Sequence, residues 1–217
     1  MQEKQIQKKQ IPEKQVTFPS GDLTLEGLIA NPGGDAPAAV VCHPHPMYGG
    51  SMFNNVVDAI LSALWQLGYS TLRFNFRGVG ASEGEHDGGR GERDDAAAAM
   101  TYLLSQPGVR QHGAVMAGYS FGAMVAVAAG YEHADVSRIV AVALPLAMMQ
   151  AQVPVGASKP LLLVSGDHDS YSPVAGLTTL RERIGKSAQL DIIKGADHFF
   201  GGNEAELSRV IATSLRS

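Results

Sequence analysis

A serine between two glycines is the residue whose type and spacing best suit covalent chemistry in this chain. Residues 118–122 read Gly-Tyr-Ser-Phe-Gly, after an apolar run at 114–117 and before a run of small residues at 123–129. This order predicts a sharp turn between a buried strand and a helix, which exposes the hydroxyl of Ser120 as a nucleophile. A Cβ at Gly118 or Gly122 would collide with the neighbouring element. The alternative is a serine that only caps the helix.

The predicted nucleophile needs a base, because a serine hydroxyl reacts poorly at neutral pH. The chain has seven histidines, and His198 directly follows the last expected strand, 189–193. A loop at that place can carry an imidazole over the carboxyl edge of a sheet. His112 precedes the strand of the serine and His133 follows its helix, so we expect both in solvent. We therefore predict His198 as the base.

The base needs a carboxylate that orients it and stabilises its charge. Residues 165–170 close another expected strand and offer Asp167 and Asp169. The residue next to a strand end is usually committed to the turn, whereas one two positions later can reach across the edge. We therefore predict Asp169 as the acid and expect Asp167 in an Asx-turn.

Attack on an acyl carbon also requires amide donors for the oxyanion that forms. The N–H of Phe121 supplies one, at the start of the expected helix, where the macrodipole is favourable. The second is expected in the loop that follows the strand at 38–42. Pro44 and Pro46 have no N–H and stiffen this loop. That leaves His45 as the predicted donor and Met47 as the alternative.

These residues must be positioned by a regular scaffold, and expected strands alternate with helices along the chain. The strands are expected at 16–19, 23–29, 38–42, 70–76, 114–117, 137–144, 160–166 and 189–193. The helices are expected at 54–67, 94–105, 177–184 and 204–216 and directly after the serine. This alternation predicts an α/β fold with a mostly parallel sheet of about eight strands. Ligand sites in such sheets lie at the carboxyl ends of the strands, where the predicted residues gather.

Composition limits the classes of function. The 217 residues are 45% hydrophobic and 18% charged, which suits one α/β domain with a sizeable core. A net charge of -4 and 6% aromatic residues argue against nucleic acid or an anionic membrane as a partner. No segment approaches the roughly 18 apolar residues of a membrane span. The single cysteine, Cys42, fits a reducing compartment and is expected to be a buried structural thiol.

The chain divides into a short tail and one domain. Residues 1–13 are polar, mixed in charge and without an apolar core of a secretory signal, so we expect a flexible tail. Residues 14–217 show no repeat and no linker and are expected to form a single domain. We expect a cytoplasmic protein that is a monomer or a homodimer.

Five ordered motifs resemble the α/β-hydrolase superfamily, specifically its small bacterial serine hydrolases without a lid domain. The motifs are His43-Pro44-His45-Pro46 with Gly49-Gly50-Ser51, Asn-Phe-Arg-Gly-Val-Gly-Ala-Ser-Glu-Gly at 75–84, Gly-Tyr-Ser-Phe-Gly at 118–122, Gly-Asp-His-Asp at 166–169, and Asp-His-Phe-Phe at 197–200. The likeness spans about residues 14 to 215. It implies the α/β-hydrolase fold, a triad of Ser120, Asp169 and His198 in that chain order, and an oxyanion loop after Cys42. Members are often described only as predicted hydrolases or carboxylesterases, so the resemblance supplies no substrate.

The resemblance also bears on the size of the substrate. The superfamily often inserts a cap between its sixth and seventh strands, but here Leu144 and Pro160 are only 16 residues apart. We therefore expect no cap domain and an open site, which favours short acyl groups over long lipids. The side chains that can line a shallow apolar pocket are Met47, Tyr48, Phe121, Leu146, Met148, Met149, Phe199 and Phe200. Core packing is an equal alternative for each of them.

The sequence therefore predicts a serine hydrolase that cleaves small or short-chain carboxylic esters through an acyl-enzyme, with no cofactor. An acyltransferase or a peptidase on the same triad is the alternative within enzymes. A non-catalytic ligand-binding protein of this fold is the alternative of another class, disfavoured because all three triad residues are present.

Three other patterns in the chain carry less weight. A metal centre built on the histidines and aspartates lacks the zinc signatures. Nucleotide binding at Gly78-x-Gly80 lacks its third glycine, since Glu83 stands there. The segment 78–91 is expected to be a polar loop, with Arg77 solvated rather than paired with an acid of that loop.

Overall fold

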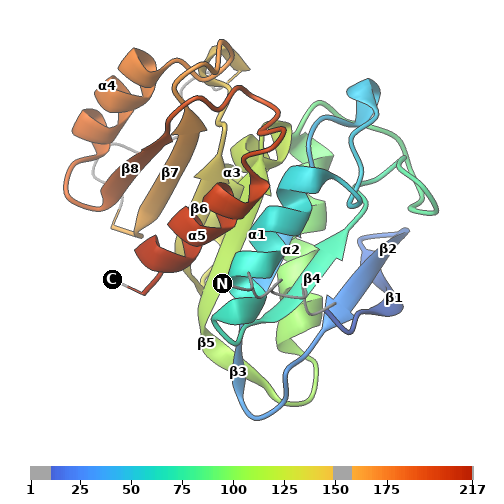
Figure 1. Ribbon diagram of the computed structural model, residues 1–217. Helices are drawn as coiled ribbons and strands as arrows, with labels where there is room; N and C mark the ends of the chain where they lie inside the picture. Colours follow the sequence, from blue (N-terminus) through green and yellow to red (C-terminus); the bar gives the residue numbers. More distant parts are fainter. Residues whose placement is uncertain (1–10, 149–157, 217) are drawn as a thin grey trace, which may run out of the picture.

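The computed structural model describes residues 11–148 and 158–216, which form one sheet covered by helices on both faces (Figure 1). The strands are β1 (Lys14–Ser20), β2 (Leu23–Ala30), β3 (Ala36–Cys42), β4 (Ser70–Phe74), β5 (Val109–Tyr119), β6 (Val136–Val142), β7 (Leu161–Gly166) and β8 (Ala188–Ile193). The helices are α1 (Asn55–Gln66), α2 (Arg90–Leu104), α3 (Phe121–Glu132), α4 (Val174–Ile184) and α5 (Glu204–Ser214). Two short 3-10 helices are η1 (Pro46–Tyr48) and η2 (Leu146–Met148).

The eight strands are ordered β1-β2-β4-β3-β5-β6-β7-β8. The pairs β1–β2 and β2–β4 are antiparallel, and every pair from β4 through β3 to β8 is parallel. The mostly parallel α/β sheet of about eight strands is thus confirmed, and β1 and β2 form a hairpin at its edge. All parallel strands end at one edge, so the loops after them meet there.

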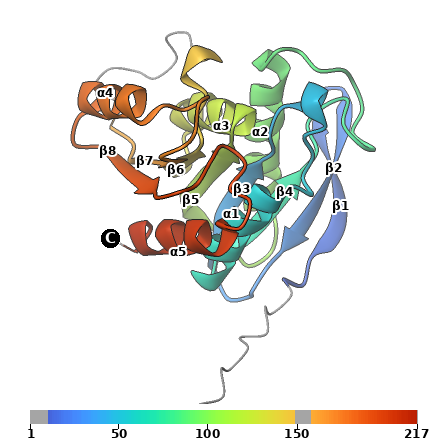
Figure 2. The same cartoon turned by 45° about the horizontal axis from the view of Figure 1, so that its top comes forward.

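The core consists of two apolar layers, one on each face of the sheet. Figure 2 shows α1 and α5 on one side and α2, α3 and α4 on the other. Strand β3 supplies both layers, because Ala38, Val40 and Cys42 face one cluster while its alternate residues face the other. This explains its continuously apolar sequence. Cys42 is buried as predicted, and burial raises the pKa of its thiol.

Helix α2 begins four residues earlier than its sequence predicts, at Arg90 instead of Asp94. The side chain of Glu92 accepts a hydrogen bond from the N–H of Gly89, which lies before the first turn. This local bond satisfies an amide that has no partner within the helix. The first turn is polar, so the hydrophobic periodicity of the sequence did not indicate that the helix begins there.

Two segments bear on the predicted domain limits. Between β6 and β7, the described residues form only η2, and residues 149–157 lie outside the described part of the chain. Of the predicted tail, residues 1–10 also lie outside it. Ile11 packs against the cluster under α1 and α5, and the carboxylate of Glu13 lies 2.5 Å from the guanidinium of Arg73. Among the residues that the structure describes, no helix has the length and apolar character needed to cross a membrane.

Candidate functional site

Ser120 lies between the end of β5 and the start of α3, in the strained turn that the sequence predicts. Its backbone has φ 55° and ψ -120°, a region that costs a non-glycine residue energy. A Cβ built on Gly118 would lie 2.1 Å from the carbonyl oxygen of Gly122, and one on Gly122 would lie 2.3 Å from that of Cys42. Both flanking glycines are therefore required by close backbone packing, and the turn presses against the loop after β3.

His198 meets the serine from the loop after β8. Its Nε2 lies 3.0 Å from Oγ of Ser120, and its side chain is nearly buried. The hydroxyl of Tyr119 donates a hydrogen bond of 3.0 Å to the carbonyl oxygen of His198. The carboxylate of Asp197 accepts hydrogen bonds from the N–H groups of Phe199 and Phe200. The backbone on both sides of the imidazole is thus held in place.

Asp169 meets the other nitrogen of the same imidazole. Its Oδ2 lies 2.9 Å from Nδ1 of His198, and its Oδ1 accepts hydrogen bonds from the N–H groups of Tyr171 and Ser172. Burial alone would raise the pKa of this carboxyl, but the hydrogen bonds and the nearby imidazole outweigh it and hold the pKa below its usual range. An ionised Asp169 assigns the proton of a neutral His198 to Nδ1, which leaves Nε2 to accept from Ser120.

Asp167 has a different place. Its Oδ1 accepts a hydrogen bond of 2.6 Å from the N–H of Gly195, so it joins the loop after β7 to the loop after β8. The expected Asx-turn is therefore wrong, because the partner amide comes from the next strand's loop. A Cβ on Gly166 would lie 2.0 Å from the carbonyl oxygen of Ala196, which shows how closely these loops pack.

The loop after β3 is fixed by His43, which sequence reasoning placed in a motif but gave no contact. Its Nε2 accepts a hydrogen bond of 3.0 Å from the N–H of Phe76, and its Nδ1 lies 2.6 Å from the carbonyl oxygen of Pro44. Burial lowers the pKa of His43 to about 4, which keeps the ring neutral at neutral pH. Both ring nitrogens are therefore used to tie this loop to the end of β4.

The two predicted amide donors lie on adjacent segments. Phe121 is the first residue of α3, so its N–H has no carbonyl partner within the helix. The ring of His45 packs 4.8 Å from the ring of Phe121, centroid to centroid. The N–H of Met47 donates to Nδ1 of His45 at 3.2 Å, which engages the alternative donor and leaves the amide of His45 as the better candidate.

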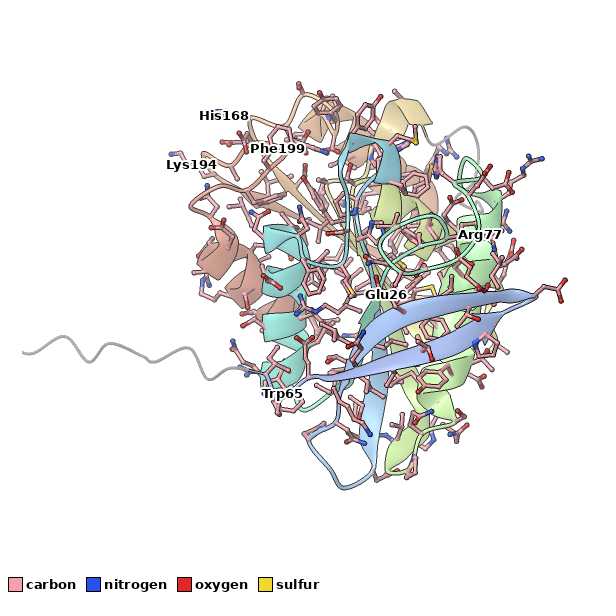
Figure 3. The ribbon with its side chains drawn as sticks, turned by 90° about the vertical axis from the view of Figure 1, so that its right-hand side faces the viewer. Glu26, Trp65, Arg77, His168, Lys194 and Phe199 are labelled. Carbon is pink, nitrogen blue, oxygen red and sulfur yellow. The ribbon has the colours of Figure 1, made fainter. Side chains whose placement is uncertain are left out.

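Three other histidines do not reach the serine. His112 is exposed on β5, as expected. The expectation for His133 is wrong, because its side chain is largely covered at the end of α3, beside Thr101 of α2. His168 is exposed, and Figure 3 shows it near Lys194 and Phe199 at one end of the molecule.

Arg77 is paired, so its expected solvation is wrong. Its guanidinium forms hydrogen bonds of 2.8 and 3.0 Å with the fully buried carboxylate of Asp95, and its N–H donates to the same group. The hydroxyl of Ser20 donates to this carboxylate as well. The partner lies in α2, outside the polar loop that the sequence offered as the source of acids.

The predicted pocket residues divide into two groups. Met47, Tyr48 and Phe199 are exposed, and Leu146 is partly buried. Phe121 and Phe200 are buried, so core packing is the correct interpretation for these two. The side chain of Met148 and all of Met149 lie outside the described part of the structure. The sequence missed exposed Tyr171, whose ring centroid lies 4.7 Å from that of His198, although it stands only two residues after Asp169.

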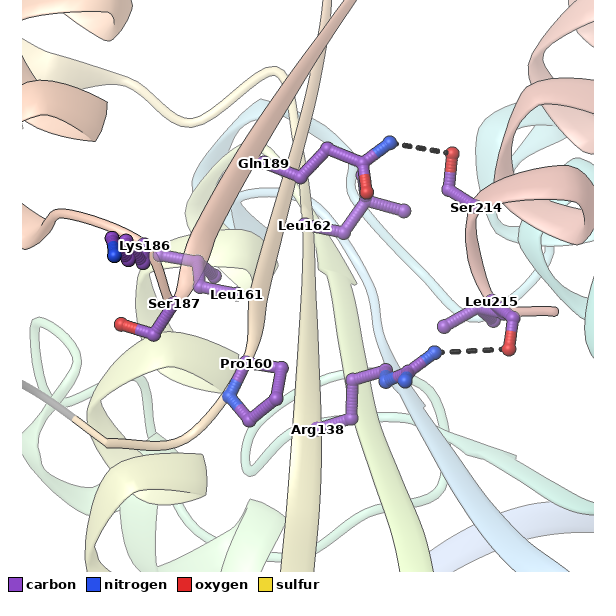
Figure 4. A pocket seen from close by; sticks show the side chains of 9 residues that line it. All are labelled: Arg138, Pro160, Leu161, Leu162, Lys186, Ser187, Gln189, Ser214 and Leu215. Atoms are coloured by element: carbon purple, nitrogen blue, oxygen red, sulfur yellow. Dashed lines mark hydrogen bonds between the residues drawn. The ribbon is translucent and has the colours of Figure 1, made fainter. Parts of the chain in front are cut away.

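A separate hollow of about 210 Å³ opens away from these residues (Figure 4). It lies between the amino ends of β6, β7 and β8 and the end of α5, at the edge opposite the serine. Its lining includes Arg138, whose guanidinium donates to the carbonyl oxygen of Leu215. Within residues 11–148 and 158–216, no three histidine, cysteine or acidic side chains are grouped to hold a metal ion.

Comparison with known proteins identifies the family of the chain. A sequence model of the alpha/beta hydrolase fold matches residues 37–160. An uncharacterized protein of Rickettsia prowazekii is 34% identical over 210 residues, covering 91% of this chain and 86% of that protein.

Solved structures extend the comparison. An alpha-beta serine hydrolase homologue from Coxiella burnetii has a TM-score of 0.84 and 32% identity, covering 93% of this chain and 97% of the other. A serine hydrolase without a lid from Xanthomonas campestris has a TM-score of 0.81 and 29% identity, covering 94% of each chain. These relatives support hydrolase activity. The chain belongs to the alpha/beta hydrolase fold family and resembles its lidless serine hydrolases.

Proposed function

We propose that this chain is a carboxylesterase that cleaves small or short-chain esters through an acyl-enzyme on Ser120. The observation that carries the proposal is the continuous chain of contacts from Oγ of Ser120 through His198 to Asp169, at 3.0 and 2.9 Å. Such a chain activates a hydroxyl that is otherwise a weak nucleophile. The strained backbone of Ser120 holds its hydroxyl at the end of the sheet.

The first half of the reaction forms the acyl-enzyme. Oγ of Ser120 attacks the ester carbonyl while Nε2 of His198 takes the hydroxyl proton, and Asp169 stabilises the resulting imidazolium. The amides of Phe121 and His45 donate to the oxyanion. When the tetrahedral intermediate collapses, the carbon–oxygen bond to the alcohol breaks and His198 returns its proton to the leaving oxygen.

The second half repeats these steps with water. His198 removes a proton from the water, which attacks the acyl carbon, and the bond to Ser120 breaks as His198 protonates Oγ. The carboxylic acid is released and the side chains return to their starting states. An alcohol or amine in place of water would make the chain an acyltransferase, the alternative that the same geometry supports.

The preference for small acyl groups rests on the exposed surroundings of the serine. Met47, Tyr48 and Phe199 have 71%, 88% and 61% of their surfaces exposed, and no described segment covers them. A long chain gains most from an enclosed apolar tunnel. We therefore propose Met47, Tyr48, Leu146 and Phe199 as a shallow apolar rim for short acyl groups.

A screen with p-nitrophenyl esters of two to twelve carbons, with matched amides and lactones, tests this proposal. Wild type should prefer the short esters, and Ser120→Ala should keep its fold by circular dichroism while losing turnover. A fluorophosphonate probe should label wild type and leave Ser120→Ala unlabelled. Equal ester turnover by the two proteins would contradict the proposal, and faster turnover of amides would move it to the peptidase.

A further inference from the structure

A second histidine–carboxylate pair lies at the carboxyl edge of the sheet, outside the proposed triad. Nδ1 of His86 lies 2.6 Å from Oε1 of Glu92, and the side chain of Glu92 is fully buried. Glu92 also accepts hydrogen bonds from the N–H groups of Asp87 and Gly89, at 2.9 and 2.8 Å. The carboxylate is thus fixed by backbone donors, and it holds one side of the His86 ring.

The ring of His86 packs against both residues whose amides are proposed to bind the oxyanion. Its centroid lies 4.8 Å from that of His45 and 5.4 Å from that of Phe121. The loop before α2 therefore contacts the loop after β3 at the edge where Ser120 lies. The side chain keeps 19% of its surface exposed. His86 therefore borders the proposed site.

The two nitrogens of His86 face different surroundings. Nδ1 is buried beside Oε1 of Glu92, and the pair is close without being aligned as a hydrogen bond. In an imidazole ring the two nitrogens are separated by one carbon and point in different directions, so Nε2 does not face Glu92 when Nδ1 does. Among the residues that the structure describes, no side chain or carbonyl bonds to this Nε2. It is a hydrogen-bonding atom that is free to meet a ligand.

The sheet order decides which part of an ester would meet it. His86 lies in the loop after β4 and His198 in the loop after β8. In the sheet order, β5, which ends at Ser120, stands between these two strands. His198 must protonate the leaving oxygen, so the alcohol part of the ester lies on its side of the serine. The acyl part then extends away from His198, beside the carbonyl oxygen that the amides of Phe121 and His45 hold, and the His86 ring borders those two residues.

We propose that Nε2 of His86 binds a hydroxyl group on the acyl part of the substrate, an inference that rests on the proposed esterase function. A hydroxyl suits either protonation state of the ring, because it accepts a hydrogen bond from an N–H and donates one to a bare nitrogen. The substrate class is therefore esters of short hydroxycarboxylic acids. His86 acts in specificity, and Glu92 positions its ring.

The test uses two pairs of p-nitrophenyl esters in which a hydroxyl replaces a methyl group. The pairs are lactate with isobutyrate, and 3-hydroxybutyrate with isovalerate. Within each pair the acyl groups have nearly the same shape, and the ratio of kcat/KM is divided by the ratio of the alkaline hydrolysis rates to remove the activation of an ester by its own hydroxyl. Wild type should favour the hydroxy ester in at least one pair by about tenfold, the factor that one hydrogen bond supplies. No preference in either pair would overturn the proposal without any variant.

Variants then separate recognition from packing. His86→Phe keeps a ring against His45 and Phe121 but removes Nε2, so the preference should fall by about tenfold. His86→Gln places an amide near the position of Nε2 and should keep most of the preference. His112→Phe, at an exposed histidine on β5 away from the site, should keep the wild-type ratio. An unchanged ratio in folded His86→Phe would overturn the role of His86.

The same assay distinguishes failure of the inference from failure of the esterase proposal. Turnover of the methyl-bearing esters by wild type but not by Ser120→Ala, without a hydroxyl preference, would refute the hydroxyacyl specificity alone. Equal turnover of all esters by wild type and Ser120→Ala would refute both. Equal losses on both members of a pair in folded His86→Phe, with restoration of neither by His86→Gln, would assign His86 to packing only.

Discussion

His43 and His198 are two nearly buried histidines at the same edge of the sheet, and they differ in what their ring nitrogens face. His43 has a backbone group against each nitrogen, which leaves no site for proton exchange. His198 has a carboxylate against one nitrogen and a hydroxyl against the other. Burial holds the first ring neutral, whereas the second is arranged to gain and lose a proton. The partners of a histidine, more than its burial, separate a structural role from a catalytic one.

The largest expected effect comes from removing the imidazole of His198, which faces the hydroxyl of Ser120. His198→Ala should lower kcat by about 10⁵-fold or more, because the serine loses its base, while the melting temperature changes little. Steady-state kinetics with calorimetry checks this. A loss below about tenfold, in protein free of wild type, would remove His198 from the mechanism.

The next largest effect is the difference in kcat between variants of the two aspartates that follow β7. Asp169→Asn should lower kcat by about 10⁴-fold, because the amide cannot stabilise the imidazolium and favours the wrong tautomer. Asp167→Asn should cost far less, since its carboxylate bonds the amide of Gly195 and lies 3.9 Å from Nε2 of His168, both outside the proposed triad. The matched pair of variants is compared on one ester. The opposite ranking would move the acid to Asp167.

A third effect concerns stability, and it belongs to His43. Its pKa is lowered to about 4 in the folded protein, against an ordinary value near 6.5 in the unfolded chain. Between these values the unfolded state binds the extra proton, so stability is lost as pH falls from about 6.5 to about 4. The contribution is roughly 3 kcal/mol, because each tenfold difference in proton affinity between the two states corresponds to about 1.4 kcal/mol.

Urea unfolding of wild type and His43→Gln at pH 7 and pH 4 measures that contribution. The variant has no titrating ring at position 43. Its loss of stability between pH 7 and pH 4 should therefore be smaller than that of wild type by roughly 3 kcal/mol. His112→Gln, at an exposed histidine on β5, is the control and should behave as wild type. Equal pH dependence in all three proteins would show that His43 does not resist protonation.

The smallest effect tests the exposed rim. Phe199→Ala should raise KM for short apolar esters by a few fold with little effect on the turnover number, since an exposed contact contributes uniformly to ground state and transition state. A series of acyl lengths measures it. A roughly hundredfold fall in the turnover number at constant KM would instead place Phe199 in the reaction itself.

Most features of the carboxyl edge of the sheet could be predicted from the sequence, because the residues that form them carry local signals. The strand–turn–helix around Ser120 and the strands at 38–42 and 160–166 are visible as apolar runs with glycines at the required positions. The place of His198 follows from strand order alone. These features depend on neighbours in the chain, so periodicity and turn chemistry are sufficient to find them.

The errors occurred where a contact joins distant segments. Arg77 was expected in solvent, but its partner Asp95 lies 18 residues later in a helix whose start was misplaced. Asp167 bonds an amide 28 residues away. No local pattern encodes which acid a given arginine meets, because that depends on how the loops pack once the sheet has formed. The His86–Glu92 pair is local, and it was missed because α2 was expected to begin only at Asp94, after Glu92.

The bond between Tyr119 and His198 joins residues 79 positions apart. The serine's strand can pair with its neighbours early, but the imidazole arrives only when β8 and its loop have docked. Long-range closure of this kind is slow relative to local structure formation. During refolding, catalytic competence should consequently emerge last. Turnover would then report the final step of folding more sensitively than fluorescence of the single tryptophan, Trp65 in α1.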